Sequence, residues 1–356
     1  MDNNLNLIRI PATDHPSLKA WNAADELMAN DSPTKEQTIG IYNDAFGSLS
    51  CRLAGSNTSI ITDLKSQETA IQTNAVSNHI EIKPEQFFLL KDALPKPLQV
   101  AYLKVPKSVA LLETYLQHIH SNLESDGKVI CGFMTKYFNK NWLALAGKYF
   151  ENVEQSKAKK KARLLILSGK KDMAPQKNIE NFQYHHLNLQ QYKGIFSGGK
   201  VDKATNYLLQ NLQIPEAHNS VLDLACGNGI IGKWILDKTS INEMHFLDDS
   251  HLALASAQLN VTDANVQFHH NYELNDFEEN SLDWVVTNPP FHFENTIDIS
   301  IPINLCRAAK ICLKPGGLLT IVANSNVGYE AFLKRHFTNV EIQNSDHQFK
   351  IYQCFK

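Results

Sequence analysis

The carboxyl-terminal half of the chain, from Asn219 onward, alternates short apolar runs with longer segments of helical apolar spacing. The short runs predict β-strands, namely SVLDLA, EMHFLD, VQFHH, LDWVVT, LLTIVA, NVEIQ and FKIYQCF. The longer segments predict α-helices, namely IIGKWILDK, SHLALASAQLNV, NLCRAAKICL and YEAFLKRHF. Strands that alternate with helices predict a mostly parallel sheet covered on both faces, and the last two strands predict an antiparallel edge.

The amino-terminal half follows the same order with weaker motifs. Its segments TIGIYNDAFGSLSCRL, SIITDLKSQETAIQTNAV and GKVICGFM occupy the places of SVLDLACGNGIIGKWI, EMHFLDDSHLALASAQLNV and GGLLTIVA. This correspondence favours a duplicated domain, although all α/β domains share a generic likeness at this level. We therefore predict an α/β protein of two tandem Rossmann-like domains, the first degenerate, each a mostly parallel sheet with an antiparallel edge.

Between the halves runs the polar segment NFQYHHLNLQQYKGIFSGGKVDKATNYLLQ. It has no long helical period before Asp202 and contains Gly194, Gly198 and Gly199, so it predicts a linker that ends in a helix. The length of 356 residues also favours two domains. We place them at 1–180 and 181–356.

Composition indicates which binding partners and which cellular compartment to expect. The net charge is −3, so contact with a nucleic acid requires a local basic patch. The cysteines lie far apart, without CxxC or zinc spacing, which indicates reduced thiols in a cytoplasmic protein and no metal site. No apolar run approaches the roughly 20 residues that span a bilayer, and the amino terminus carries no export signal, so we expect no membrane association.

The segment LDLACGNGIIG places Gly227, Gly229 and Gly232 at GxGxxG spacing after a strand and before a helix. Glycines there let the backbone turn sharply and approach a ligand at the helix amino terminus. The spacing alone does not identify the ligand. Asp223 lies inside the preceding strand, where its charge would repel a pyrophosphate and attract a cationic amino-acid group. This favours S-adenosylmethionine over NAD as the cofactor.

Three side chains qualify this interpretation. Asp248 ends the next strand, where a carboxylate can accept ribose hydroxyls, although it can also cap the following helix. Asn271 ends the third strand and can bond the adenine edge, or serve as an ordinary turn residue. For Asp223 the alternative is a side chain that caps the loop by bonding neighbouring N–H groups.

The fourth strand ends in TNPPFH, residues 287–292. Asn288 leaves this strand at the ligand-binding edge of the predicted sheet. Its side-chain carbonyl and the Pro289 carbonyl can accept the two protons of a planar exocyclic amine, while Pro289 and Pro290 hold these acceptors rigid. Phe291 can stack on the ring that bears the amine. The alternative is a structural Pro-Pro stop at the end of a strand.

The motifs VLDLACGNGIIG, LDD and TNPPFH resemble the small-domain class of S-adenosylmethionine-dependent methyltransferases, whose NPPF members modify the exocyclic N2 of guanine in RNA. The first-half segments RIPATDHPSLKAWNAADELM, IYNDAFGSLSC, LKVPKSVALLETYL and KKKARLL resemble the bacterial ribosomal RNA large subunit methyltransferase G family, which carries a duplicated domain. The resemblance covers nearly the whole chain. It implies cofactor binding by Asp223, Gly227, Gly229, Asp248 and Asn271, and guanine binding by Asn288, Pro289, Pro290 and Phe291.

The chain departs from this family at one point and loses motifs at another. The family usually has Asp-x-Gly where this chain has Asp202, Lys203 and Ala204, which puts a backbone contact to the cofactor in doubt. The first half retains Gly47 alone of the loop glycines and has Lys104 in place of the asparagine. We expect that half to bind neither cofactor nor target base.

A basic cluster interrupts the first half. Such a run is often only a solvated face, but in a slightly acidic chain it favours phosphate contact. Its members are Lys157, Lys159, Lys160, Lys161 and Arg163.

Together these features predict a cytoplasmic, monomeric enzyme that transfers a methyl group from S-adenosylmethionine to the exocyclic N2 of a guanosine in large-subunit (23S) ribosomal RNA. One alternative is the related small-subunit (16S) guanine-N2 enzyme. A methyltransferase of protein glutamine would more naturally carry tyrosine at Phe291. A non-catalytic RNA-binding assembly factor is a further alternative, which the intact Asn288 and Gly227 disfavour.

Overall fold

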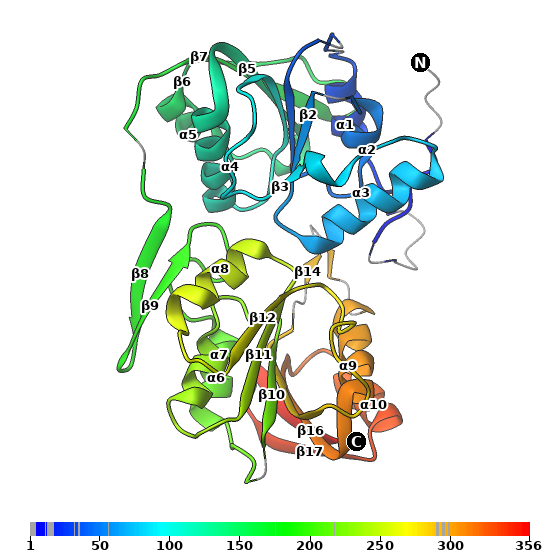
Figure 1. The fold of residues 1–356 in the computed structure, drawn as a ribbon, viewed down its shortest axis with the longest axis vertical. Coiled ribbons are helices and arrows are strands. Elements are labelled where there is room, and N and C mark those ends of the chain that lie inside the picture. Colours follow the sequence, from blue (N-terminus) through cyan, green and yellow to red (C-terminus); the bar gives the residue numbers. More distant parts are fainter. Residues whose placement is uncertain are drawn as a thin grey trace. The chain divides into compact units, whose positions relative to one another are not determined.

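The structure is a computed structural model that describes residues 5–10, 12, 18–31, 33–34, 36–55, 57–174, 176–216, 218–289, 292–293, 296–297 and 300–356 (Figure 1). By their contacts these residues form two compact units, Met1–Asn178 and Ile179–Lys356.

The first unit contains a seven-stranded sheet in the order β3-β2-β1-β4-β5-β7-β6. Its strands are β1 (Ile39–Tyr42), β2 (Thr58–Ile61), β3 (Phe87–Phe88), β4 (Leu98–Lys104), β5 (Leu123–Met134), β6 (Phe150–Gln155) and β7 (Ala162–Lys170). Its helices are α1 (Ala23–Ala29), α2 (Ser48–Arg52), α3 (Lys65–Ser77), α4 (Val109–Asn122) and α5 (Asn141–Tyr149), with 3-10 turns at Pro84–Gln86 and Thr135–Tyr137.

The second unit repeats this sheet in the order β12-β11-β10-β13-β16-β18-β17. Its strands are β10 (Ser220–Leu224), β11 (Glu243–Asp248), β12 (Val266–His270), β13 (Leu282–Thr287), β16 (Leu313–Asn324), β17 (Asn339–Ser345) and β18 (Phe349–Phe355). Its helices are α6 (Lys203–Asn211), α7 (Ile230–Leu236), α8 (His251–Asn260), α9 (Ser300–Cys312) and α10 (Tyr329–His336). Two short hairpins accompany them, β8 (Ile179–Tyr184) with β9 (Leu187–Tyr192) and β14 (His292–Phe293) with β15 (Thr296–Ile297).

The two sheets match strand for strand, and this confirms the predicted fold class. In each, the central strands are parallel, and the last two strands in the order are antiparallel to their neighbours. Two unrelated α/β domains would not be expected to share the order of all seven strands in the sheet. A duplicated domain therefore explains the match better than the general similarity among α/β domains.

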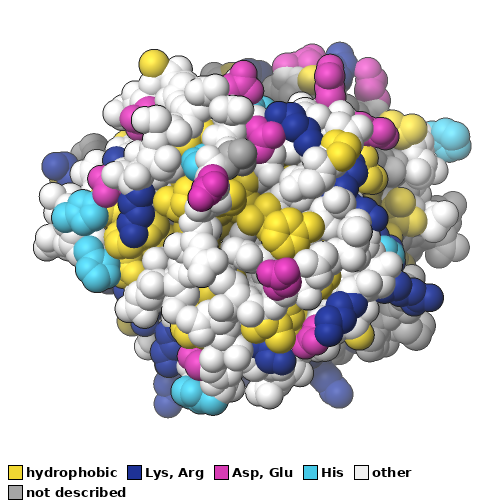
Figure 2. All heavy atoms as spheres, turned by 90° about the horizontal axis from the view of Figure 1, so that it is seen from below, with side chains coloured by type: hydrophobic (Ala, Val, Ile, Leu, Met, Phe, Trp, Pro, Cys, Tyr) yellow, Lys and Arg dark blue, Asp and Glu magenta, His cyan; other side chains and the backbone are white. Residues whose placement is uncertain are grey.

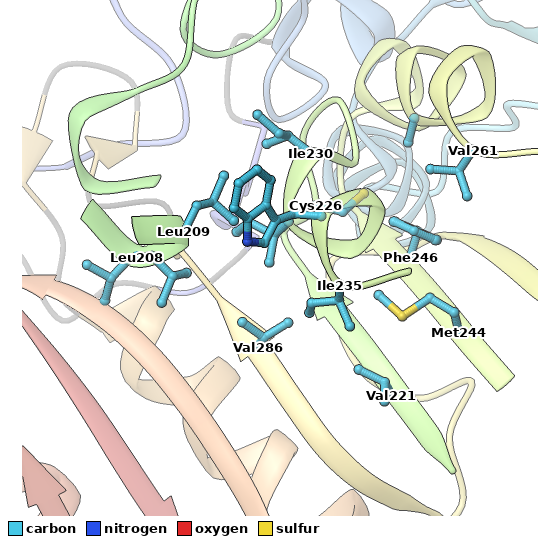
Figure 3. Close-up of a cluster of buried hydrophobic side chains, with 14 of the residues drawn as sticks. Leu208, Leu209, Val221, Cys226, Ile230, Ile235, Met244, Phe246, Val261 and Val286 are labelled. Atoms are coloured by element: carbon cyan, nitrogen blue, oxygen red, sulfur yellow. The ribbon is translucent and has the colours of Figure 1, made fainter. Parts of the chain in front are cut away.

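Alternate side chains of the second sheet enter two apolar layers. Val221, Phe246 and Val286 pack with α6, α7 and α8 on one face (Figure 3), whereas Leu222 and Val285 pack with α9 and α10 on the other. In Figure 1, α6 to α8 and α9 to α10 lie on opposite sides of the strands. This burial on both faces explains why the central strands read as continuous apolar runs.

The segment that was expected to be a linker forms the hairpin β8–β9, so that expectation was wrong. Leu187 and Leu189 are buried in the layer that contains α7 and α8, whereas the alternate residues Asn188 and Gln190 are exposed. The sequence LNLQQY does alternate with the period of a strand, but its polar content obscured the pattern. The helix expected after Asp202 is present as α6.

Candidate active site

The predicted site residues follow the carboxyl ends of three neighbouring parallel strands. Leu224 of β10 pairs with Leu247 of β11 and with Thr287 of β13, so these strands end side by side. The glycine loop follows β10, Asp248 closes β11 and Asn288 follows β13. Ligands of open α/β sheets bind outside the carboxyl ends of the strands, so this edge is the expected binding site.

The backbone of the glycine loop adopts conformations that are unfavourable for residues with a side chain. Gly227 and Gly229 have φ angles of 56° and 76°, in the left-handed region. A Cβ on Gly229 would lie 2.9 Å from the Cβ of Ala257, and one on Gly232 would lie 2.3 Å from the Phe246 ring, so both glycines allow close packing. A Cβ on Gly227 would meet no described atom within 4 Å, which leaves that side of the loop open to a ligand.

Asp248 supports the glycine loop with its carboxylate. Its Oδ2 accepts a hydrogen bond from the Gly227 N–H at 2.8 Å, and its Oδ1 accepts one from the Ser250 N–H at 2.8 Å. The N-cap of α8 is Ser250, whose hydroxyl accepts from the Ala253 N–H. Carboxylate oxygens have further lone pairs, so Asp248 can also accept from the hydroxyls of a ribose. That role stays a prediction.

Asp223 lies beneath the loop and is fully buried. Its Oδ2 accepts from the Gly232 N–H at 2.8 Å, and its Oδ1 has no hydrogen-bond partner among the described residues. Burial raises the pKa of Asp223 well above its ordinary value, the Gly232 bond opposes this shift, and the nearby Asp248 charge adds to it. Through the bond to Gly232, the Asp223 side chain caps the loop. Attraction of a cationic cofactor stays a prediction.

Asn271 begins a local turn. Its Oδ1 accepts from the Glu273 N–H at 3.2 Å, and its Nδ2 donates to Asp276 Oδ1 at 3.3 Å. Its backbone N–H donates to the Asp248 carbonyl at 3.1 Å. These contacts are those of an ordinary turn residue, and the adenine contact stays a prediction.

The side-chain amide of Asn288 is oriented by two hydrogen bonds from its nitrogen. Nδ2 donates to Thr205 Oγ1 at 2.9 Å and to Asp202 Oδ2 at 3.2 Å. Oδ1 is buried and finds no hydrogen-bond partner in the part of the chain that the structure describes. A buried acceptor without a partner is costly, and a ligand donor would satisfy it. The site therefore suits a ligand that carries an N–H.

A pocket joins Asn288 to the glycine loop. Its lining comes from segments 196–205 and 225–231 and from Asn288. Phe196 is 68% exposed at this pocket, which is unusual for a large aromatic side chain. Pro289 is buried next to Asn288, whereas the predicted Pro290 and Phe291 lie outside the described residues.

A buried polar network connects the glycine loop to the hairpin β8–β9. Asn228 Nδ2 donates to Gln191 Oε1 at 2.8 Å, and Gln191 Nε2 donates to Glu180 Oε1 at 2.7 Å. Asn260 Nδ2 donates to the Asn228 carbonyl at 2.9 Å. Sequence reasoning missed this network because Gln191 falls in the polar segment that was interpreted as a linker. Recognising the strand period in LNLQQY would have indicated that Gln191 points inward.

The basic cluster forms a tight turn between β6 and β7. Lys159 and Ala162 exchange two backbone hydrogen bonds of 2.9 Å, and Lys160 and Lys161 between them have φ angles of 49° and 61°. Lys157, Lys159, Lys160 and Lys161 are exposed, and Lys160 Nζ lies 2.9 Å from Glu26 Oε2. Arg163 is half-buried and donates to Gln155 Oε1 at 3.1 Å. The lysines are thus more accessible to a partner than Arg163.

Within the described ranges we also searched for metal sites, reactive cysteines and membrane-spanning helices. No group of three or more His, Cys, Asp or Glu side chains there is placed to hold a metal ion. All six cysteines are buried as free thiols. None of the helices in this part of the chain is long and apolar enough to cross a membrane.

The fold, the glycine loop and a match to the methyltransferase small domain family identify the chain as an S-adenosylmethionine-dependent methyltransferase of the small-domain class. The methyltransferase small domain family matches residues 186–353, and the RLMG N-terminal domain family matches residues 1–172. The ribosomal RNA large subunit methyltransferase G of Shewanella oneidensis is 32% identical, over 99% of this chain and 97% of its own. The protein of that name from Psychromonas ingrahamii is 30% identical, over 100% and 97%. The chain therefore belongs to the ribosomal RNA large subunit methyltransferase G family.

A solved structure shares the whole two-unit fold. The 16S rRNA N2 methyltransferase of T. thermophilus, in complex with AdoMet and guanosine, superimposes with a TM-score of 0.77. The match covers 96% of this chain and 94% of that protein at 18% identity. At this identity the similarity concerns the fold, and it supports the tandem arrangement of two methyltransferase-like sheets.

Proposed function

We propose that this chain transfers a methyl group from S-adenosylmethionine to the exocyclic N2 of a guanosine in 23S ribosomal RNA, in the cytoplasm and as a monomer. Family membership supports the enzyme class and the ribosomal RNA substrate. The observation that carries the chemistry is the buried Asn288 Oδ1, an acceptor without a partner among the described residues, next to the open side of the glycine loop.

The residues of the second unit suit the cofactor. The loop is open at Gly227, and Asp248 lies where it can accept from ribose hydroxyls. Asp223 provides a buried acceptor oxygen near the loop, and Asn271 follows the adjacent strand β12. When bound, S-adenosylmethionine supplies an electrophilic methyl group on a sulfonium.

The chain's own task is to position the nucleophile. Transfer of a methyl from a sulfonium to a neutral amine disperses charge, so orientation carries most of the catalysis. Asn288 Oδ1 and the Pro289 carbonyl would accept the two amine protons and direct the nitrogen lone pair toward the methyl. The proline ring fixes φ and so keeps its part of this arrangement rigid. Stacking of the guanine on Phe291 completes the proposed base site.

We propose that the first unit contributes RNA binding through the lysine turn. Lys160 and Lys161 occupy left-handed backbone positions that normally favour glycine or asparagine. Residues in such positions often serve a function that compensates for the strain. On the face shown in Figure 2, by contrast, basic side chains are interspersed with acidic ones. A local cluster therefore accounts for phosphate contact better than a general surface charge.

Mass-spectrometric mapping of methylated guanosines in ribosomal RNA tests this function. In a strain that lacks the protein, we expect one N2-methylguanosine of 23S rRNA to disappear and to return when the parent chain is supplied. Disappearance from 16S rRNA would identify the small-subunit enzyme instead. Unchanged methylation with defective ribosome assembly would identify a non-catalytic factor.

A further inference from the structure

We propose that Asp202 and Thr205 are positioning residues for methyl transfer, an inference that rests on the proposed function. They fix the amide of Asn288 so that its carbonyl, and not its NH2 group, faces the target amine. Between them the chain departs from the pattern of its family at Ala204, and the motif alone does not assign either residue this role.

The contacts account for both protons of the Asn288 amide. The nitrogen Nδ2, which carries two hydrogens, donates to two acceptors, Thr205 Oγ1 at 2.9 Å and Asp202 Oδ2 at 3.2 Å. With both donors engaged, the amide cannot rotate without losing two hydrogen bonds. The buried Oδ1 is then the group left for a ligand.

Reversal of this amide would disable the site. A flipped Asn288 would present two N–H donors to an exocyclic amine that must itself donate. Two donors cannot pair, and the lone pair of the amine would lose its alignment. A carboxylate oxygen is the partner that best prevents reversal, because it accepts hydrogen bonds and cannot donate them when ionised.

Asp202 is itself held firmly by the start of α6. Its Oδ2 also accepts from the N–H groups of Ala204 at 2.8 Å and Thr205 at 3.2 Å, which makes it the N-cap of the helix. Thr205 is 6% exposed, so its hydroxyl is fixed by packing. Alanine at 204, where the family usually has glycine, leaves this cap intact. The helix therefore supplies the rigidity that positions Asn288.

Two substitutions separate positioning from helix capping. Asp202→Ser keeps a good N-cap but is too short to reach Asn288. Thr205→Val keeps the shape and removes the acceptor, whereas Thr205→Ser restores the hydroxyl. With saturating S-adenosylmethionine, we expect Asp202→Ser and Thr205→Val to lower the single-turnover rate roughly 10- to 100-fold, and Thr205→Ser to recover most of it. Affinity for ribosomal RNA should change less than about twofold, since the phosphate contacts remain.

A double-mutant cycle supplies the decisive readout. If Asp202 acts through Asn288, then Asp202→Ser should have no further effect on the residual rate of Asn288→Ala. A merely structural role would lower both rates by the same factor. As a control, Ser108→Ala removes the N-cap of α4 in the first unit and should leave the rate unchanged.

The outcomes distinguish the two levels of the proposal. A parent chain that methylates no guanosine overturns the proposed function and this inference with it. A parent chain that methylates guanosine while Asp202→Ser and Thr205→Val react at the parent rate overturns the positioning role alone. Equal effects of Asp202→Ser in the parent and in the Asn288→Ala background also overturn it.

Discussion

The two units differ most instructively at the end of their central strand. Lys104 ends β4 and Asn288 follows β13 at the equivalent place, because Leu103 and Thr287 have the same pairing register. In each unit an acidic residue at the start of the helix before the first central strand contacts this residue. Asp25 Oδ2 of α1 lies 2.9 Å from Lys104 Nζ, and Oδ2 of Asp202, the N-cap of α6, lies 3.2 Å from Asn288 Nδ2. The ion pair in the first unit occupies the place where the second unit keeps an open acceptor.

The loops after β1 and β10 also differ in how far their polar groups are paired within the protein. Gly47 and Gly229 are both left-handed N-caps, with φ of 82° and 76°. In the first unit, however, Asp44 Oδ2 accepts from the Leu49 N–H, the Ser50 N–H and the Ser50 hydroxyl, at 2.7 to 2.9 Å. That loop satisfies its own polar groups, whereas the second leaves an open side at Gly227. Loss of a site in a duplicated domain can therefore proceed by internal pairing while the fold is kept.

The largest effect is expected from breaking the ion pair of the first unit. Lys104→Met leaves Asp25 buried without its cation, and this should lower the free energy of unfolding by about 3–5 kcal/mol. Urea denaturation followed by circular dichroism measures it. As a matched control, Lys128→Met breaks the half-exposed pair with Asp31 and should cost only about 0–1 kcal/mol. Equal losses in the two variants would show that the buried pair has no special role.

The next effect concerns the equivalent residue of the second unit. Asn288→Ala should raise the barrier to methyl transfer by about 2–4 kcal/mol, as when one donor of an oxyanion hole is removed. Single-turnover methylation of ribosomal RNA at saturating cofactor measures this barrier. RNA affinity should hold, because the phosphate contacts are elsewhere. Methylation at the parent rate would reduce TNPPFH to a strand stop.

Placing the lysine of the first unit at position 288 tests the comparison between the two strand ends directly. Asn288→Lys copies the first unit, because the ammonium can pair with Asp202. We expect a folded protein with no detectable methyl transfer, since the open acceptor is replaced by a cation. Circular dichroism and the same single-turnover assay check both parts. Retained transfer would show that the carbonyl of Asn288 is dispensable.

The sequence was informative where one local pattern decides the outcome. The alternation of strands and helices, the glycine loop and the strand end at Asn288 each follow from spacing or from residues adjacent in the chain. It was silent where distant segments meet: Asp202 and Asn288 are 86 residues apart, and Lys104 and Asp25 are 79 apart. No periodicity reports such pairs. Their partners became visible only once the fold had brought the helix starts to the strand ends.

A smaller effect is expected for the cofactor. Asp248→Ala should weaken binding of S-adenosylmethionine by about 1–3 kcal/mol, because the ribose hydroxyls lose an acceptor and the Gly227 N–H loses its support. Thr62 stands at the corresponding place of the first unit, after Ile61, and Thr62→Val should leave affinity unchanged. Isothermal titration calorimetry compares the two. Binding of NAD in place of S-adenosylmethionine would contradict the assigned cofactor.

The smallest effect concerns the exposed lysines of the first unit. Replacing Lys159, Lys160 and Lys161 by glutamine keeps the length of the side chains and removes three charges from the turn. Each lost phosphate contact should flatten the dependence of log affinity on log salt concentration by about 0.7–0.9. Lys160 already pairs with Glu26, so its share should be the least.

Titration of a fluorescent rRNA fragment at several salt concentrations measures the slope. The matched control replaces Lys83, Lys91 and Lys107, which are also exposed in the first unit, by glutamine, so that the same charge is removed. If both triple variants shift the slope equally, the response reflects net charge and the turn has no particular role. A shift confined to the turn variant, with unchanged cofactor affinity, would assign RNA binding to the unit whose own site is closed by an ion pair.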